Sequence, residues 1–346
     1  MANPFTLSFG KEPSQYISRT VQTAAIADAF NAQDPVTQIY MISGVRGSGK
    51  TVLLTEVTKR FESLEEWIVV DLNPNRDMLQ SLAAKLYGIP VLYKEFVKLK
   101  FNFSYFGLGV SVESESPITD IEQALDVMLK TIGKMGKKVL VTVDEAVNNE
   151  HVRVFASSFQ IYLRRNYPLF VLMTGLYNNI SDIQNEKTLT FLYRAPKIVM
   201  SPLNITAIAS RYNAIFGISM KQSMSMAKLT MGYPFAFQVL GYLCWENKAQ
   251  DNIEAILPEY DRYLEEFVYE KIWAELSQRD KEVVSAIAEN GIYEVKEIRK
   301  KLDMTSGEMS VYRNRLEKKG LIDTSKYGKI TLALPRFAEI VKNWNM

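Results

Sequence analysis

The chain has almost none of the residues that disulfides, soft metal sites and histidine catalysis need. It holds one cysteine and one histidine among 346 residues. The single cysteine, Cys244, excludes an internal disulfide framework, and its apolar stretch "FQVLGYLCW" predicts a core position. The histidine, His151, lies in "NNEHVRV" and is predicted at the surface. Both counts argue against a histidine-rich metal site and against a histidine general base.

The sequence also lacks a long apolar run and a marked excess of charge. No segment approaches the roughly 18 apolar residues of a membrane span. The stretch "MANPFTLSFG" has neither the basic start nor the apolar run of a secretory leader. We therefore expect a cytoplasmic protein with no membrane partner. The formal net charge is +2, and residues 271–346 hold 15 basic and 11 acidic residues, so a mild basic surplus lies there.

Apolar, β-branched stretches alternate with helical patterns over the first 205 residues. The expected strands are residues 37–43, 65–73, 137–146, 167–175 and 196–203. Such alternation predicts an α/β fold, a parallel sheet covered by helices on both faces in three αβα layers. After residue 203 we expect helices with a turn at "MGYP", and from Leu276 three more helices and a small ribbon.

One segment breaks this rhythm. Residues 99–114, "LKFNFSYFGLGVSVES", alternate with period two around Gly107 and Gly109, which predicts an inserted β-hairpin. Its apolar face would either pack in the core or form a partner surface.

The stretch "GVRGSGKT", directly after the first expected strand, matches G-x-x-x-x-G-K-[ST] in full. It consists of Gly44, Val45, Arg46, Gly47, Ser48, Gly49, Lys50 and Thr51. An apolar helical pattern follows, so the motif has its strand–loop–helix context. Backbone N–H groups of such a loop and the helix N-terminus bind phosphate. Lys50 would contact the β- and γ-phosphates of ATP, and the Thr51 hydroxyl would bind Mg²⁺.

A second acidic strand supports this reading. "VLVTVDEA" places Asp144 and Glu145 at the end of a buried strand, where an open α/β sheet binds its ligands. Asp144 would bind Mg²⁺, and Glu145 would polarise the attacking water. Two adjacent carboxylates favour hydrolysis of ATP over binding alone.

The loop, the acidic strand and the strand order together resemble AAA+-type ATPases. The resemblance implies a polar sensor of the γ-phosphate at the end of the strand between the two motif strands, here Thr174. "LTFLYRAPKIVMSPL" resembles the LY-G-R stretch of the archaeal-type ATPases within the signal-transducing (STAND) ATPases, with Tyr193 in place of the glycine. That resemblance implies that Arg194 is an arginine finger or phosphate sensor, in cis or in trans. Arg164 and Arg165 are the alternative.

Two further motifs extend the resemblance. Gly232-Tyr233-Pro234 resembles the G-x-P lid motif of the STAND class, which implies that Pro234 packs near the nucleotide. Replication-initiator relatives carry an arginine on this helix, and residues 232–243 contain none. "YISRT" resembles the family's entry motif, two apolar residues and then G-R-E, which implies that Arg19 meets the nucleotide and its segment covers the adenine.

The C-terminal pattern of three helices and a ribbon describes a winged helix-turn-helix, with Ser306 as the cap of its third helix. The positions expected to be exposed for DNA contact are Ser310, Arg313, Asn314, Lys318, Lys319, Lys326 and Lys329. Arginine and asparagine can pair with base edges, and lysine mainly meets phosphate. Since the charge surplus is small, the alternative is a module that binds protein.

These patterns predict an ATPase core over residues 1–205, a helical lid over 206–268 and a winged helix over 269–346. ATP and Mg²⁺ would close the lid, favour a homo-oligomer and control double-stranded DNA binding. The alternative is a regulatory ATPase whose winged helix binds protein. A structural nucleotide binder without turnover is disfavoured by the intact Asp144-Glu145 pair. Steep salt dependence of binding would identify a DNA reader.

Overall fold

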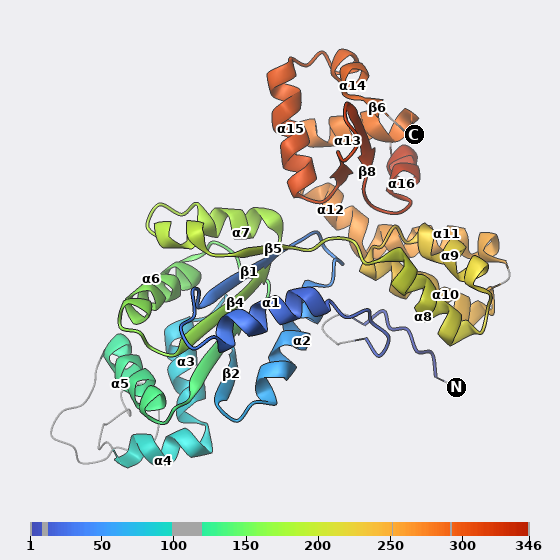
Figure 1. Cartoon of the computed structure of the whole chain (residues 1–346). Helices are drawn as coiled ribbons and strands as arrows, with labels where there is room; N and C mark the ends of the chain where they lie inside the picture. Colours follow the sequence, from blue (N-terminus) through green and yellow to red (C-terminus); the bar gives the residue numbers. More distant parts are fainter. Residues whose placement is uncertain (1, 9–12, 99–119, 251, 291–292, 345–346) are drawn as a thin grey trace. The chain divides into compact units, whose positions relative to one another are not determined.

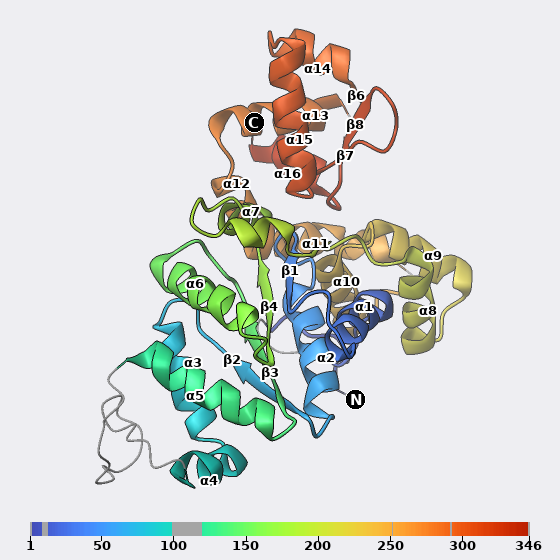
Figure 2. The same cartoon turned by 60° about the vertical axis from the view of Figure 1, so that its left-hand side comes forward.

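The computed structural model in Figures 1 and 2 describes residues 2–8, 13–98, 120–250, 252–290 and 293–344. The chain forms two compact units. The sheet unit consists of Ser18–Ser43 and Lys50–Val199, and the helical unit of Met1–Ile17, Gly44–Gly49 and Met200–Met346. The hairpin expected at residues 99–114 lies outside the described residues.

The sheet unit is built on five parallel strands in the order β2-β3-β4-β1-β5. They are β1 (Ile39–Ser43), β2 (Trp67–Asp71), β3 (Lys138–Val143), β4 (Leu169–Gly175) and β5 (Lys197–Val199). Each lies within a predicted stretch, so the parallel sheet is confirmed. The helices are α1 (Thr20–Asn31), α2 (Lys50–Glu62), α3 (Met78–Tyr87), α4 (Pro90–Lys98), α5 (Ile121–Lys134), α6 (Glu150–Arg164) and α7 (Tyr177–Gln184).

Both faces of this sheet are covered, as its continuous apolar strands require. Val139 and Val141 of β3 join the core cluster formed with α3, α5, α6 and α7. On the other face, the Phe170 ring of β4 lies 5.1 Å from that of Phe30 in α1. Figure 2 shows α2 and α5 on opposite sides of the strands. Alternate residues of each strand therefore serve the two faces, and polar groups reach the sheet only at strand ends.

The helical unit contains the segment expected as a lid. Its helices are α8 (Ile205–Phe216), α9 (Met220–Leu229), α10 (Pro234–Asn247), α11 (Leu257–Leu264) and α12 (Glu270–Ala274), with a 3-10 turn η3 (Ile253–Ile256) and a π-helical turn η4 (Glu265–Tyr269). The predicted turn at "MGYP" joins α9 to α10. Phe5 packs on Gly241, where a Cβ would lie 2.3 Å from its ring. Cys244 is buried as predicted, and burial raises the pKa of its thiol to about 12.

The C-terminal module, residues 278–344 of the helical unit, consists of helices around a small sheet. Its elements are α13 (Gln278–Asn290), β6 (Tyr293–Glu294), α14 (Val295–Lys301), α15 (Ser306–Lys318), β7 (Ile322–Asp323), β8 (Lys329–Leu332) and α16 (Phe337–Trp344). The sheet is antiparallel in the order β6-β8-β7. The three predicted helices and the ribbon are present. β6 and α16 were not predicted, although Phe337, Ile340 and Val341 recur at helical spacing and are buried.

The cap of α15 differs from the prediction. Thr305, not Ser306, is the N-cap, and it forms a capping box with Glu308. The Glu308 side chain accepts from the Thr305 N–H at 2.8 Å, and the Glu308 N–H donates to the Thr305 hydroxyl. Threonine and serine are both good caps, and the acidic residue three positions later selects Thr305.

No helix in the described ranges is both long and apolar enough to cross a membrane.

Candidate functional site

The loop Gly44–Gly49 has a backbone that depends on glycine at two positions. Gly47 and Gly49 have φ values of 71° and 85°, in the left-handed region that favours glycine. A Cβ at Gly47 would also lie 2.3 Å from the Tyr233 hydroxyl oxygen. Position 47 is variable in the G-x-x-x-x-G-K-[ST] motif, so the motif alone did not single out Gly47. The close approach of Tyr233 adds a second reason, beside the left-handed φ, why this residue is glycine.

The "GYP" turn holds the outer side of this loop. The Tyr233 hydroxyl donates a 2.5 Å hydrogen bond to the Arg46 carbonyl, and the Phe235 N–H donates to the Gly47 carbonyl at 3.2 Å. Tyr233 is 4% exposed, and burial raises the pKa of its phenol far above the usual value, so it remains a donor. A Cβ on Gly49 would lie 3.7 Å from Pro234. The loop carbonyls are thus bound by the first turn of α10.

Two side chains of the loop lie against other parts of the helical unit. The Arg46 guanidinium forms a 2.9 Å ion pair with Glu275, directly after α12. Val45 packs against the core cluster of the helical unit and lies close to Gly320, at the end of α15. Val45 and Arg46 therefore remain candidates for phosphate binding through their backbone N–H groups, because the Arg46 side chain pairs with Glu275 and the Val45 side chain packs near Gly320.

The carboxylate of Asp144 joins the two motifs within the sheet unit. The Thr51 hydroxyl donates to Asp144 Oδ2 at 2.8 Å, and the Thr174 hydroxyl donates to Oδ1. The Glu145 N–H also donates to Oδ1, at 3.1 Å. Thr51 is the second residue of α2. Asp144 directly follows β3, and Thr174 is the next-to-last residue of the neighbouring strand β4. The parallel register brings these strand ends to one edge of the sheet.

Glu145 has an unusual backbone. Its φ is 53°, a left-handed conformation that costs a residue with a Cβ about 1 kcal/mol. Its N–H lies 3.1 Å from Asp144 Oδ1 and 3.4 Å from the Thr174 hydroxyl, and its side chain is exposed. Backbone strain of this kind concentrates at functional sites, where surrounding bonds hold it. The turn therefore exposes the Glu145 carboxylate beside that of Asp144, whose two oxygens both accept hydrogen bonds.

The oxygen pair of Thr51 and Asp144 fits a magnesium ion. Mg²⁺ prefers oxygen ligands and is usually bound by one or two carboxylates together with phosphate and water. One hydroxyl and one carboxylate in direct contact form such a partial set. Among the described residues there is no cluster of three or more histidine, cysteine, aspartate or glutamate side chains that could hold a metal alone.

Thr174 does not project freely from the end of β4, as a direct phosphate sensor would. It is fully buried, its hydroxyl is bound to Asp144, and its carbonyl accepts from the Ala146 N–H at 2.7 Å. The Thr174 hydroxyl therefore contacts the rest of the site through Asp144 and the Glu145 N–H.

The candidate arginines lie in different places. Arg194 ends the 3-10 turn η2 (Thr190–Arg194) and is exposed beside Tyr193, which is 73% exposed. A 3-10 turn has negative φ, so tyrosine replaces glycine here without strain. Helix α6 runs from the carboxyl end of β3 back to the amino end of β4, and Arg164 and Arg165 lie at its C-terminus. They are therefore near the amino ends of the strands, whereas Asp144 is at the carboxyl ends. Arg165 is also paired with Asp126.

Arg19 precedes α1 and lies beside α2. Its N–H is 3.4 Å from the Glu56 carboxylate, which also accepts from the Ser18 hydroxyl. Burial lowers the pKa of the Arg19 guanidinium, and Glu56 partly offsets this. In the sheet unit, its described neighbour is therefore a carboxylate of α2. His151 is exposed, as predicted.

The C-terminal module keeps five of the seven expected contact residues at its surface. Ser310, Asn314, Lys318, Lys326 and Lys329 are exposed. Lys319 is not: its side chain is 14% exposed and lies 3.5 Å from Asp280, a 1% exposed carboxylate. Arg313 is half-buried, and its Nε is buried with no hydrogen-bond partner among the residues that the structure describes.

The Asp280 carboxylate explains the position of Lys319. It also binds Arg315, at 2.5 Å and 2.9 Å, and forms a capping box with Ser277 before α13. A buried carboxylate needs such partners, so it draws inward Arg315 of α15 and Lys319, which directly follows the helix. Tyr327, fully exposed at the tip between β7 and β8, was not predicted as a surface feature.

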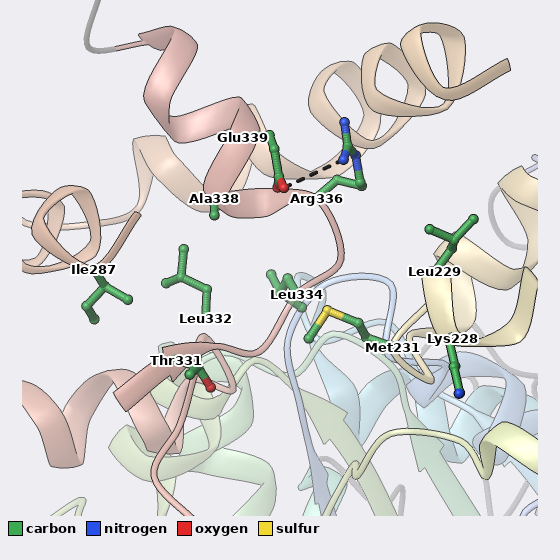
Figure 3. Close-up of a pocket in the computed structure, with 10 residues that line it drawn as sticks. All are labelled: Lys228, Leu229, Met231, Ile287, Thr331, Leu332, Leu334, Arg336, Ala338 and Glu339. Atoms are coloured by element: carbon green, nitrogen blue, oxygen red, sulfur yellow. Dashed lines mark ion pairs between the residues drawn. The ribbon is translucent and has the colours of Figure 1, made fainter. Parts of the chain in front are cut away.

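A separate cavity of about 310 Å³ lies in the helical unit between the end of α9 and the β8–α16 region (Figure 3). Its walls are partly apolar and partly polar, with an ion pair between Arg336 and Glu339. None of the predicted site residues lines it, so it is distinct from the candidate site.

The comparisons agree with this architecture. A family model described as "Domain of unknown function (DUF8462)" matches residues 266–341. No curated protein matches the chain. The Walker-type ATPase of Pyrococcus abyssi is similar in structure, with a TM-score of 0.64 and 14% identity over 94% of this chain and 95% of that chain. The ORC2 protein of Aeropyrum pernix, in its ADPNP-ADP complexes, is also similar in structure. Its TM-score is 0.61, with 14% identity over 97% of this chain and 96% of that chain. The predicted fold, a parallel sheet covered by helices and followed by a helical C-terminal region, is thus confirmed.

Proposed function

We propose that the chain is a magnesium-dependent ATPase that acts as a molecular switch. The observation that carries the proposal is the 2.8 Å bond between Thr51, which ends the phosphate-loop motif, and Asp144, which ends the acidic strand. Two motifs separated by 93 residues in sequence meet as a pair of oxygen ligands. ATP would bind with its phosphates at residues 44–51, with Lys50 beside the β- and γ-phosphates.

The residues around Thr51 and Asp144 would each have a separate role in ATP hydrolysis. Mg²⁺, held by Thr51 and Asp144, would neutralise phosphate charge. Glu145, with its exposed carboxylate, would accept a proton from the attacking water. Thr174 would sense the phosphate state through Asp144, which its hydroxyl holds in place. Arg194 would stabilise negative charge, in cis or from a second copy of the chain.

Removal of magnesium tests this arrangement. ATP turnover should fall to background in EDTA and return with added Mg²⁺. Because Thr174 binds a metal ligand, Thr174→Val should raise the Mg²⁺ concentration for half-maximal turnover by roughly 10- to 100-fold. Thr174→Ser keeps the hydroxyl and is the matched control. EDTA-insensitive turnover, or equal Mg²⁺ dependence for Thr174→Val and Thr174→Ser, would contradict the proposal.

The lid is proposed to read nucleotide state through the loop. The carbonyls of Arg46 and Gly47 are bound by the first turn of α10, so their peptide planes are fixed from the lid side. Those planes also orient N–H groups of the loop. A change in the loop on phosphate binding or release would therefore alter hydrogen bonds of Tyr233 and Phe235. The Arg46–Glu275 pair extends this connection to the segment before the C-terminal module.

In this proposal residues 1–205 form the ATPase core, 206–268 the lid and 269–346 a winged helix of the STAND or archaeal-type kind. Arg19 and Pro234 would lie near the nucleotide, and the ATP state would favour a homo-oligomer in the cytoplasm. The winged helix would bind double-stranded DNA through Ser310, Asn314, Lys318, Lys326 and Lys329, with Arg313 and Lys319 in secondary roles. A signalling partner protein at the same surface is the second candidate, since Asp280 neutralises two of the cations of α15.

Salt dependence separates the two candidates. DNA contact predicts that affinity for a duplex falls steeply as salt rises, because bound lysines release counterions. Lys326→Gln/Lys329→Gln should reduce the slope of log affinity against log salt by about two. Lys221→Gln/Lys248→Gln removes the same charge from exposed sites outside the module and should leave the slope unchanged. Absence of duplex binding at low salt, with and without ATP, would favour the protein partner.

A further inference from the structure

We infer that Gln184 is a positioning residue for Arg194, an inference that rests on the proposed ATPase function. Gln184 is the last residue of α7 and is 5% exposed. Its side-chain amide donates to the Leu192 carbonyl at 3.2 Å and to the Ala195 carbonyl at 3.3 Å. These two carbonyls lie on either side of the Tyr193-Arg194 pair. One buried amide therefore closes the turn that carries the arginine.

The turn is anchored at both ends and open in the middle. Leu192 is fully buried and Ala195 is 9% exposed, whereas Tyr193 and Arg194 are exposed. The Ala195 N–H also donates to the Leu192 carbonyl, at 3.0 Å. Within the described residues Arg194 makes no ion pair or hydrogen bond. A long cation held on a short, fixed turn without a neutralising partner is suited to meet a negative group from outside the turn.

The same C-terminal end of α7 is also bound to the loop that follows Asp144 and Glu145. Asn148, three residues after Glu145, donates to the Glu186 carboxylate at 3.1 Å and to the Asp182 carbonyl at 3.4 Å. The hydrogen bond from Asn148 lowers the pKa of Glu186, so this carboxylate stays ionised and remains an acceptor. Gln184 lies between Asp182 and Glu186 in sequence. α7 thus connects the loop after Glu145 with the turn of Arg194, and Gln184 makes the second connection.

This role predicts a specific kinetic pattern. Gln184→Met keeps the volume of the side chain and removes the donor. It should lower kcat by roughly 10- to 100-fold, because displacement of a charge-stabilising group by about 1 Å has such effects. The affinity for ATP should change by less than about twofold, because Gln184 contacts no residue proposed to bind ATP. A matched control, Asn185→Ala, removes an exposed amide that bonds to Ser181 and should leave kcat unchanged.

A double-mutant cycle separates positioning of Arg194 from a general structural effect. Arg194→Ala alone should lower kcat by at least about 100-fold. In the Arg194→Ala background, Gln184→Met should cause no further loss, because the group that it positions is gone. The same fold loss in both backgrounds would overturn the inference while leaving the ATPase proposal intact. Full activity of Arg194→Ala would overturn both the inference and the proposed role of Arg194.

Folding is checked by thermal unfolding of each variant. If Gln184→Met does not fold, Gln184→Asn is used in the same cycle, because it keeps a buried amide but withdraws it by one methylene. The expected results are the same: lowered kcat with unchanged ATP affinity, and no further loss with Arg194→Ala.

Discussion

Glu145→Gln should retain ATP binding and lose ATP turnover by about 1,000-fold, within the range for removal of a general base. Glutamine keeps the size of the side chain and the left-handed backbone but cannot accept the proton of an attacking water. The oxygens of Thr51 and Asp144 are untouched, so magnesium and ATP should bind as before. Turnover is measured by phosphate release, and binding by calorimetry.

The same variant exposes the state of the lid. With ATP bound and not hydrolysed, amide hydrogen exchange at Phe235 and the first turn of α10 should differ persistently from that of the nucleotide-free chain. The control is Glu150→Gln, an exposed carboxylate in the first turn of α6, which should behave as the wild type. Undiminished ATP turnover of Glu145→Gln would show that Glu145 is not the general base. Unchanged amide hydrogen exchange would show that the lid does not respond to bound ATP.

Lys50→Ala should weaken ATP binding by about 100-fold and abolish turnover at cellular ATP concentrations. An ammonium group that bonds to two phosphates contributes about 3 kcal/mol, and each 1.4 kcal/mol is a tenfold change in affinity. Lys50 is the first residue of α2, so its replacement by a good helix former should leave the helix intact. The measurement is the dissociation constant for ATP, with the unfolding midpoint as a check on folding.

The comparison variant is Lys59→Ala, an exposed lysine in the last turn of the same helix. It should bind ATP normally, which separates loss of one phosphate contact from loss of positive charge on α2. Equal ATP affinity for Lys50→Ala and the wild type would mean that the loop does not bind the triphosphate, and the proposed function would fall.

The sequence by itself determined which residues form the strands of the sheet, because periodicity and local motifs depend only on residues that are neighbours in sequence. The strands β1 to β4 are short apolar runs ended by a glycine or a carboxylate, and parallel strands must be covered on both faces. The phosphate loop and Asp144-Glu145 follow from motif and context in the same way. Thr174 was expected from the resemblance to AAA+-type ATPases, which implies a polar residue near the end of this strand.

Only the tertiary structure decided which groups those residues contact, because contacts between distant segments leave no local pattern. At position 47 a side chain is excluded by the left-handed backbone and also by Tyr233, which is 186 residues away in sequence. Lys319 reads as an exposed cation on a helix, yet the buried carboxylate of Asp280 draws it inward. No sequence motif identifies Gln184. Its importance follows from two carbonyls that the fold brings to its amide, one on each side of Arg194.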